Sequence, residues 1–176
     1  MSPRPSLSAR DLHQAFVDAL KGRVLAHSDV ERKPLELDLA APLPARVRIY
    51  AYTLTDPPGG RPAGEFKIQI IAPGQQKGQR ASFDTSEGRF VVLAGYHPGT
   101  RVFVLWDALL YPNFPHSRNV QVTDATVFGA LAGLVSRQER QLKTGDEVVL
   151  AAQAPQLAAA LRERFALAVD RVTALP

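Results

Sequence analysis

The sequence predicts an α+β protein, in which a mainly antiparallel or mixed β-sheet of about five strands is flanked by N-terminal and C-terminal helices. Residues at helical spacing lie at both ends of the 176-residue chain, and alternating or apolar segments with hairpin-length connections lie between them. The length and the hydrophobic fraction of 45% fit a single domain over residues 1–176 with a poorly ordered N-terminus.

The first predicted element is an amphipathic helix that Ser8 caps and that ends near Gly22. Its apolar residues recur at helical spacing: Leu12, Phe16, Val17 and Leu20. Residues 25–44 contain prolines and mixed charges, so we expect a connector without periodicity of its own.

Two alternating strands are expected next. In residues 45–55 (ARVRIYAYTLT), successive side chains alternate between two faces as in a strand, and residues 56–64 (DPPGGRPAG) form the turn that follows it. Residues 65–73 (EFKIQIIAP) form a second strand with one apolar and one polar face. The polar face carries Glu65, Lys67 and Gln69.

The most apolar segments predict the centre of the sheet. Residues 88–96 and 101–108 pair as a hairpin, and residues 119–122 form a short further strand. Thr123 or Asp124 caps a helix over residues 125–142, and residues 143–152 form an edge strand. Pro155 starts the last helix.

Composition excludes several classes of protein. The chain has no cysteine, which rules out disulfides, thiolate zinc sites and thiol nucleophiles. It also lacks a membrane-crossing apolar stretch and a signal-peptide pattern, so we expect a soluble, cytoplasmic protein. The formal net charge of +4 favours an anionic partner such as nucleic acid.

One enzyme alternative remains open. Asp56, Glu65 and Lys67 resemble the core of the PD-(D/E)xK nucleases, in which two carboxylates hold a divalent metal and a lysine orients water. Residues 116–119 lack the second histidine and the surrounding pattern of an HNH nuclease. We find no complete catalytic apparatus, and we expect neither a cofactor nor a metal.

The loop LYPNFPHSRNVQV, residues 110–122, raises two possibilities. Its prolines stiffen the backbone, so its aromatic rings can be presented to a partner at little entropic cost. Alternatively, Tyr111 and Phe114 only plug the end of the sheet. The segment GQQKGQRAS, residues 74–82, carries Lys77 and Arg80 without an acid and can wrap a phosphate backbone or simply remain a solvated loop.

Several segments carry a resemblance to a known family: GRPAGEFKIQ, FDTSEGRFVVLAGY, VFVLWDALLYPNFPHSRNVQV and SRQER. They resemble the sulfur-binding domain of McrA-type restriction endonucleases over about residues 45 to 170. In that family, the domain binds DNA in which sulfur replaces one non-bridging phosphate oxygen.

The resemblance implies a sulfur pocket whose apolar wall is formed by Tyr111, Pro112 and Pro115. Pro115 stands where the family is expected to have alanine, which changes the width of the pocket. Arg61 occupies the place of an arginine that supports the modified phosphate. Gly60 precedes it, so a histidine partner must come from elsewhere, and His116 is the candidate.

The remaining affinity for DNA is assigned to polar and basic side chains that contact phosphates or base edges. These are Arg118, Asn113, Lys67, Gln69, Lys77, Arg80, Asn119 and Gln121. Family members usually join this domain to an HNH nuclease, which is not visible here. We therefore expect a recognition module for phosphorothioate-modified double-stranded DNA that is not itself an enzyme, with a protein-binding module as a further alternative.

Overall fold

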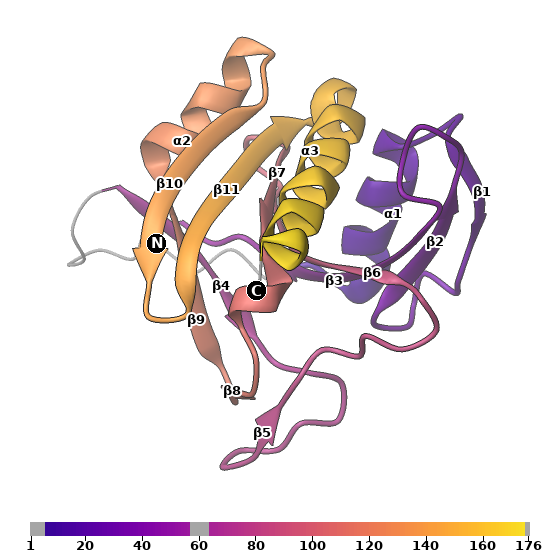
Figure 1. Cartoon of the computed structure of the whole chain (residues 1–176). Helices are drawn as coiled ribbons and strands as arrows, with labels where there is room; N and C mark the ends of the chain where they lie inside the picture. The colour runs from indigo at the N-terminus through magenta and orange to yellow at the C-terminus, as the bar shows by residue number, and fades with distance from the viewer. Residues whose placement is uncertain (1–5, 57–63, 175–176) are drawn as a thin grey trace.

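The computed structural model describes residues 6–56 and 64–174. This part of the chain forms three α-helices, a seven-stranded mixed sheet and two two-stranded sheets, which is the predicted α+β class (Figure 1). The elements are α1 (Ala9–Ala19), β1 (Val24–His27), β2 (Leu35–Leu39), β3 (Arg46–Thr53), β4 (Glu65–Ile70), β5 (Arg80–Ala81), β6 (Phe90–His97), β7 (Val102–Trp106), the 3₁₀ helix η1 (Ala108–Leu110), β8 (Phe114–Pro115), β9 (Arg118–Thr123), α2 (Asp124–Gly129), η2 (Ala130–Ala132), β10 (Ser136–Leu142), β11 (Gly145–Gln153) and α3 (Ala154–Thr173).

The large sheet has the strand order β1-β2-β3-β6-β7-β11-β10. Neighbouring strands are antiparallel except β3 and β6, which run parallel. Because successive residues of a strand point to opposite faces, the sheet supports two separate cores. The sheet has more strands than the roughly five expected, because β1 and β2 lie in the segment predicted to be a connector and β10 lies in the segment predicted to be a helix.

The helices α1 and α3 cover one face of the sheet, which we call the helix-covered face. The Ser8 hydroxyl accepts a hydrogen bond from the Asp11 amide at 3.1 Å and caps α1, as predicted. Leu12, Phe16 and Leu20 are buried against the strands. Pro155 lies in the first turn of α3, which is also as predicted.

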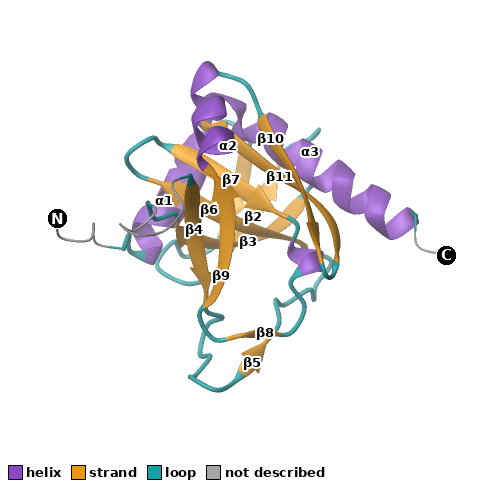
Figure 2. Ribbon diagram, turned by 90° about the vertical axis from the view of Figure 1, so that its left-hand side faces the viewer, coloured by secondary structure: helices purple, strands orange, loops and turns teal. Residues whose placement is uncertain are grey.

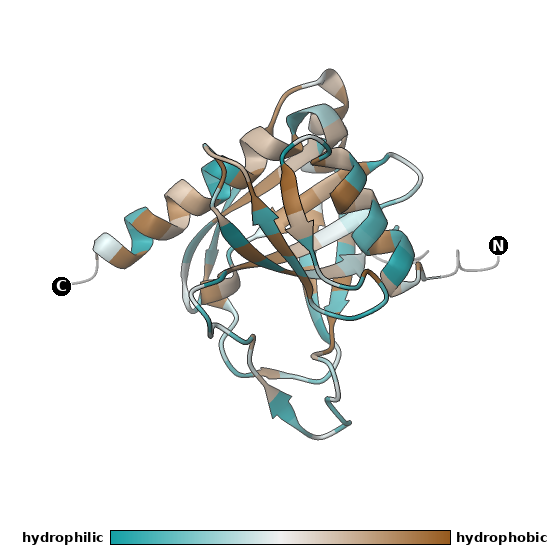
Figure 3. Ribbon diagram, turned by 90° about the vertical axis from the view of Figure 1, so that its right-hand side faces the viewer, coloured by the Kyte–Doolittle hydropathy of each residue, from teal (hydrophilic) through white to brown (hydrophobic). Residues whose placement is uncertain are grey.

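The opposite face of the sheet is covered by an antiparallel ribbon of β4 and β9, here called the ribbon (Figure 2). Gly95 of β6 permits this close approach, because a Cβ atom there would lie 2.9 Å from Cγ2 of Ile68. The two-stranded pairing of β5 and β8 lies below the ribbon in the view of Figure 2. Figure 3 shows hydrophobic residues concentrated in the strands in the body of the fold.

The predicted central hairpin is confirmed, since β6 and β7 pair antiparallel in the middle of the sheet. The predicted strands at residues 45–55, 65–73 and 119–122 are also present as β3, β4 and β9. None of the helices within residues 6–56 and 64–174 is long and apolar enough to cross a membrane.

Three expectations about local structure are wrong. Residues 25–44 are not a plain connector but contain β1 and β2, because Leu35, Leu37 and Leu39 alternate with acidic residues and bury one face. The helix expected over residues 125–142 ends at Gly129, and residues 136–142 form β10. The segment 143–152 belongs to β11, which lies between β7 and β10 and is therefore not an edge strand.

The early end of the predicted helix has a local cause. Gly133 has a φ of +83°, which is left-handed backbone that glycine adopts easily. At Gly129, a Cβ atom would lie 2.6 Å from the Ser136 hydroxyl oxygen, so the chain folds back tightly here. The residues that follow alternate between half-buried and exposed, as a strand requires.

Candidate nucleic-acid interface

The outer face of the ribbon brings together four of the residues predicted to bind DNA. Lys67 of β4 is opposite Gln121 of β9, and Gln69 is opposite Asn119. Alternate residues of both strands are buried against the sheet: Phe66, Ile68, Ile70, Val120 and Val122. The four polar side chains therefore share the face of the ribbon that points away from the sheet.

A second group of predicted residues lies in two loops that pair with each other, residues 75–82 and 112–117, here called the flap. Arg80 pairs with Pro115, and Ala81 pairs with Phe114, through β5 and β8. The Arg80 guanidinium donates to the Asn113 carbonyl. The side-chain Nε2 of Gln75 donates to the Phe114 carbonyl at 3.3 Å. The flap thus joins the basic segment 74–82 to the proline-containing loop.

The aromatic rings of this loop are buried, which agrees with the second of the two possibilities, that Tyr111 and Phe114 plug the end of the sheet. Tyr111 is 2% exposed and Phe114 is 0% exposed. The Phe114 ring packs on Phe83 with centroids 4.8 Å apart. The two prolines differ from the rings, because Pro112 and Pro115 are both exposed. The accessible apolar surface of the loop is therefore provided by pyrrolidine rings.

Arg118 covers the ring of Tyr111. It begins β9 opposite Ile70, and its guanidinium carbon lies 5.2 Å from the centroid of the Tyr111 ring, a cation–π contact. His116 is half-buried, with Nδ1 3.0 Å from the Ser117 hydroxyl oxygen. Three residues that the resemblance assigns to a sulfur site or to DNA binding are therefore neighbours at the start of β9.

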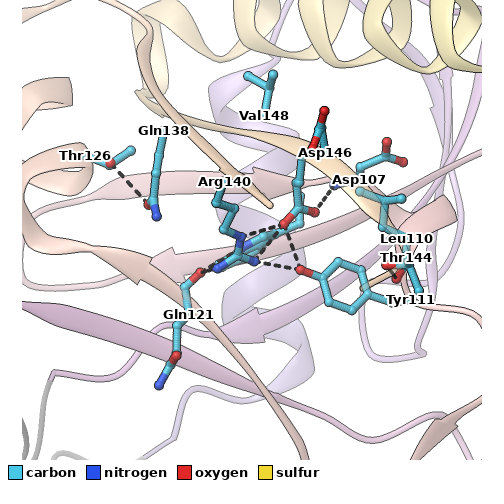
Figure 4. A network of polar contacts seen from close by, with 12 residues as sticks. Asp107, Leu110, Tyr111, Gln121, Thr126, Gln138, Arg140, Thr144, Asp146 and Val148 are labelled. Carbon is cyan, nitrogen blue, oxygen red and sulfur yellow. Dashed lines mark hydrogen bonds and ion pairs between the residues drawn. The ribbon is translucent and has the colours of Figure 1, made fainter. Parts of the chain in front are cut away.

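Tyr111 is held in place by a buried polar network that the sequence did not reveal (Figure 4). Its hydroxyl donates to Oε1 of Glu147 at 2.8 Å and accepts from Nη2 of Arg140 at 2.6 Å. Arg140 also donates to the carboxylate of Glu147 at 2.8 Å and to the Gln121 carbonyl at 2.6 Å. Figure 4 shows the Gln121 side chain directed away from this cluster.

The network keeps the Tyr111 hydroxyl protonated. Burial is the main cause that raises the pKa of Tyr111, and the nearby Glu147 carboxylate raises it further, while Arg140 opposes them. A neutral hydroxyl between a carboxylate and a guanidinium satisfies both ions. The ring therefore has a fixed position beneath Arg118.

The start of the loop is fixed by a second set of contacts. Asp107 caps η1 through the Leu109 amide at 3.0 Å, and its own amide donates to Oε2 of Glu147 at 3.1 Å. Arg171 of α3 donates to Oδ2 of Asp107 at 2.7 Å. The loop that follows η1 is thus connected both to β11 and to α3.

The residues of the nuclease alternative are only partly brought together. Asp56 and Lys67 line the same cleft, and Oδ1 of Asp56 lies 2.8 Å from Nε2 of His97. Glu65 is exposed at the start of β4. Within residues 6–56 and 64–174 there is no group of three or more histidine or acidic side chains that could hold a metal ion. Arg61 lies outside the described residues.

Sequence reasoning missed Arg140 and Glu147 because it placed residues 136–142 on a helix. The sequence did contain a signal. The segment SRQERQL also fits a strand, and it is followed by the turn Lys143-Thr144-Gly145. In that register Arg140 is directly opposite Glu147 across the hairpin. Opposite charges in such a pair stabilise a hairpin.

Comparison with known protein families gives a match over most of the chain. The model of the family described as methylase-associated X1 matches residues 45–161. This range begins just before β3 and ends within α3, so it includes the ribbon, the flap and the Tyr111 network. No curated protein and no solved structure matches the chain.

Proposed function

Because the chain belongs to the methylase-associated X1 family, whose description links it to methylases and so to restriction–modification, we propose that it is a DNA-recognition module. The ribbon and the flap form the proposed contact surface. Its preferred target is double-stranded DNA that carries phosphorothioate linkages.

The observation that carries this proposal is the polar face of the ribbon. A two-stranded β-ribbon fits the major groove of B-DNA, where asparagine and glutamine amides read base edges and lysine contacts guanine or phosphate. Lys67 and Gln121 form one pair on this face, and Gln69 and Asn119 form the next. Four side chains of this chemistry on one exposed surface match the groove better than they match an apolar protein partner.

The flap supplies charge beside the ribbon. Lys77 and Arg80 come from its first loop, and Arg118 follows its second. Each basic side chain that neutralises a phosphate releases a counterion, which makes affinity depend on salt. The formal net charge of +4 supports association with a polyanion.

Selectivity for sulfur is proposed to come from the loop of residues 111–117. Sulfur is larger and a weaker hydrogen-bond acceptor than oxygen, so contact with pyrrolidine carbons of Pro112 and Pro115 sacrifices little hydration. An oxygen without a partner there costs roughly 1–3 kcal/mol, or about tenfold to a hundredfold in affinity. Both prolines are exposed and available for this contact.

The Tyr111 ring can contact the sulfur only if the Arg118 side chain moves. We propose that Arg118 turns from the Tyr111 ring toward a phosphate, which uncovers the ring as the inner wall of the pocket. The contact that is lost is worth about 0.5–1 kcal/mol, whereas a charge-assisted hydrogen bond to phosphate is worth about 1.5–3 kcal/mol. Arg61 and His116 are proposed to support the modified phosphate, as the resemblance implies.

We assign no catalytic step to this chain. In the proposed function it delivers an HNH-type nuclease, in the same polypeptide or in trans, to the modified site. Purified protein with a divalent cation is then expected to leave DNA uncut. Cleavage that depends on Asp56 and Lys67 would favour the nuclease alternative instead.

The deciding experiment is a gel-shift titration with matched duplexes, one with a phosphorothioate linkage and one without. Wild-type protein is expected to retard both and to prefer the modified duplex by about tenfold to a hundredfold. The double variant Pro112→Ser/Pro115→Ser should lose most of that preference while it still binds the ordinary duplex. Absence of retardation at physiological salt would instead favour a protein-binding module.

A further inference from the structure

A cleft of about 730 Å³ lies beside the ribbon and outside the flap. Its walls come from the segment before α1, from Lys33 two residues before β2, from the end of β3 and the residues after it, and from β4 with residues 71–74. The lining side chains that carry polar groups are Ser6, Lys33, Tyr52, Thr53, Thr55, Asp56, Lys67 and Gln69. Lys67 and Gln69 therefore belong both to the outer face of the ribbon and to this cleft.

Lys33 is the cation that the interface described above does not use. Its ammonium nitrogen lies 4.7 Å from the centroid of the Tyr52 ring, and it forms no ion pair with an acid of residues 6–56 or 64–174. Lys33 is an exposed residue, and partial desolvation of its ammonium lowers its pKa. An anion bound beside this ammonium would favour its charged form.

The threonine hydroxyls of the cleft are already hydrogen-bonded within the protein. Thr53 accepts from the Leu7 amide at 2.9 Å and lies 3.3 Å from the Ser6 hydroxyl, and the Thr55 hydroxyl donates its hydrogen to the Lys67 carbonyl at 3.2 Å, so the lysines are the groups that complement an anion. Asp56 carries a negative charge at the same cleft, next to His97. The two ammonium groups outnumber this carboxylate.

Resting on the proposed DNA-binding function, we infer that this cleft binds the phosphodiester backbone of the same duplex, with Lys33 and Lys67 contacting neighbouring phosphates. Continuity supports DNA as the occupant, because a strand that follows the ribbon past Gln69 enters the cleft directly. Lysine and glutamine side chains are among the groups that proteins commonly direct to phosphates. The footprint on DNA then extends from the flap to the N-terminal end of α1.

The test compares Lys33→Ala with Lys21→Ala in titrations of an unmodified duplex at several salt concentrations. Lys21 is an exposed lysine just beyond the opposite end of α1, so it controls for the loss of one positive charge. Lys33→Ala should weaken binding about threefold to tenfold and reduce the salt slope by about one. Lys21→Ala should change neither, and Lys33→Arg should restore both.

Asp56→Asn gives a prediction of opposite sign, since removing the carboxylate from the cleft should strengthen binding. Equal affinities for wild type, Lys33→Ala and Asp56→Asn would overturn this inference while leaving the proposed function intact. If wild-type protein fails to retard any duplex, the proposed function fails and this inference fails with it. A rise in the pKa of Lys33 on addition of duplex, followed by NMR of ¹³C-methylated lysines, is the expected independent sign of phosphate contact.

Discussion

The two faces of the large sheet differ in the kind of side chains that they bury. Toward α1 and α3, the central strands direct mainly apolar side chains, such as Val47 and Ile49 of β3 and Leu150 of β11, while Arg137 of the edge strand β10 forms an ion pair with Glu163 of α3. Toward the ribbon, the same strands also direct Arg48 and Glu147, both nearly inaccessible to solvent. A face that only has to be buried needs complementary volume, whereas a face that positions a binding loop needs directional contacts.

Buried charges on the ribbon side are held by several partners each. Arg48 donates to the Asp84 carbonyl at 2.8 Å and to the Ser86 carbonyl at 3.1 Å. These residues belong to the long connection between β5 and β6. Glu147 likewise holds the loop at Tyr111, because its carboxylate accepts a hydrogen bond from the Tyr111 hydroxyl. Both charges fix irregular chain that packing alone would leave free to move.

The largest expected change in stability tests whether Arg140 and Glu147 on the ribbon side are energetically coupled. Arg140→Ala leaves the Glu147 carboxylate buried without its cation, and we expect a loss of about 3–5 kcal/mol in the free energy of unfolding. Glu147→Gln in the same chain should recover part of that loss. Urea denaturation of the two single variants and the double variant measures the coupling, expected at about 0.5–3 kcal/mol.

The matched control uses the helix-covered face. Leu37 on β2 and Leu150 on β11 are separated by three strands, or roughly 19 Å at about 4.8 Å per strand. Leu37→Ala and Leu150→Ala should each cost about 2–5 kcal/mol and should add within about 0.5 kcal/mol. Additivity at Arg140 and Glu147 would show that the network is not a unit.

Much of the fold and part of the site could be predicted from sequence, for reasons that the residues make clear. The alternation in residues 65–70 and 119–122 placed Lys67, Gln69, Asn119 and Gln121 on exposed faces. Alternation does not identify the partner strand, so the pairing of β4 with β9 was not predicted. The local pattern likewise could not predict that Tyr111 is buried, because its hydrogen-bond partners Arg140 and Glu147 lie 29 and 36 residues further along the chain.

The next prediction compares how a buried residue on each side of the sheet makes the free energy of unfolding depend on pH. On the helix side, burial lowers the pKa of His13, partly opposed by its contact with the Val30 carbonyl. The unfolded chain therefore takes up a proton near pH 6.5 that the folded protein resists. Stability contributed by neutral His13 is complete above that pH and is lost as pH falls through the folded pKa.

On the ribbon side, the sign is reversed. Burial raises the pKa of Tyr111 above that of an unfolded tyrosine, which is about 10. Its contribution is complete below pH 10 and is lost as pH rises toward the folded pKa. Urea titrations should show His13→Gln flattening the acid limb and Tyr111→Phe flattening the alkaline limb, each by at most about 1.4 kcal/mol per pH unit. An effect of Tyr111→Phe confined to acid pH would contradict this assignment.

The smallest expected change in stability concerns Arg118, which lies on the ribbon side but is assigned to DNA rather than to the core. Its contact with the Tyr111 ring is worth about 0.5–1 kcal/mol, so Arg118→Ala should lower the free energy of unfolding by no more than that. The same variant should weaken binding to modified and ordinary duplexes alike and reduce the salt slope by about one. Arg23→Ala, at an exposed arginine before β1, serves as the control and should leave the slope unchanged. If Arg118→Ala instead destabilises the fold as much as Arg140→Ala does, Arg118 is part of the structural network and cannot be the residue that turns toward a phosphate.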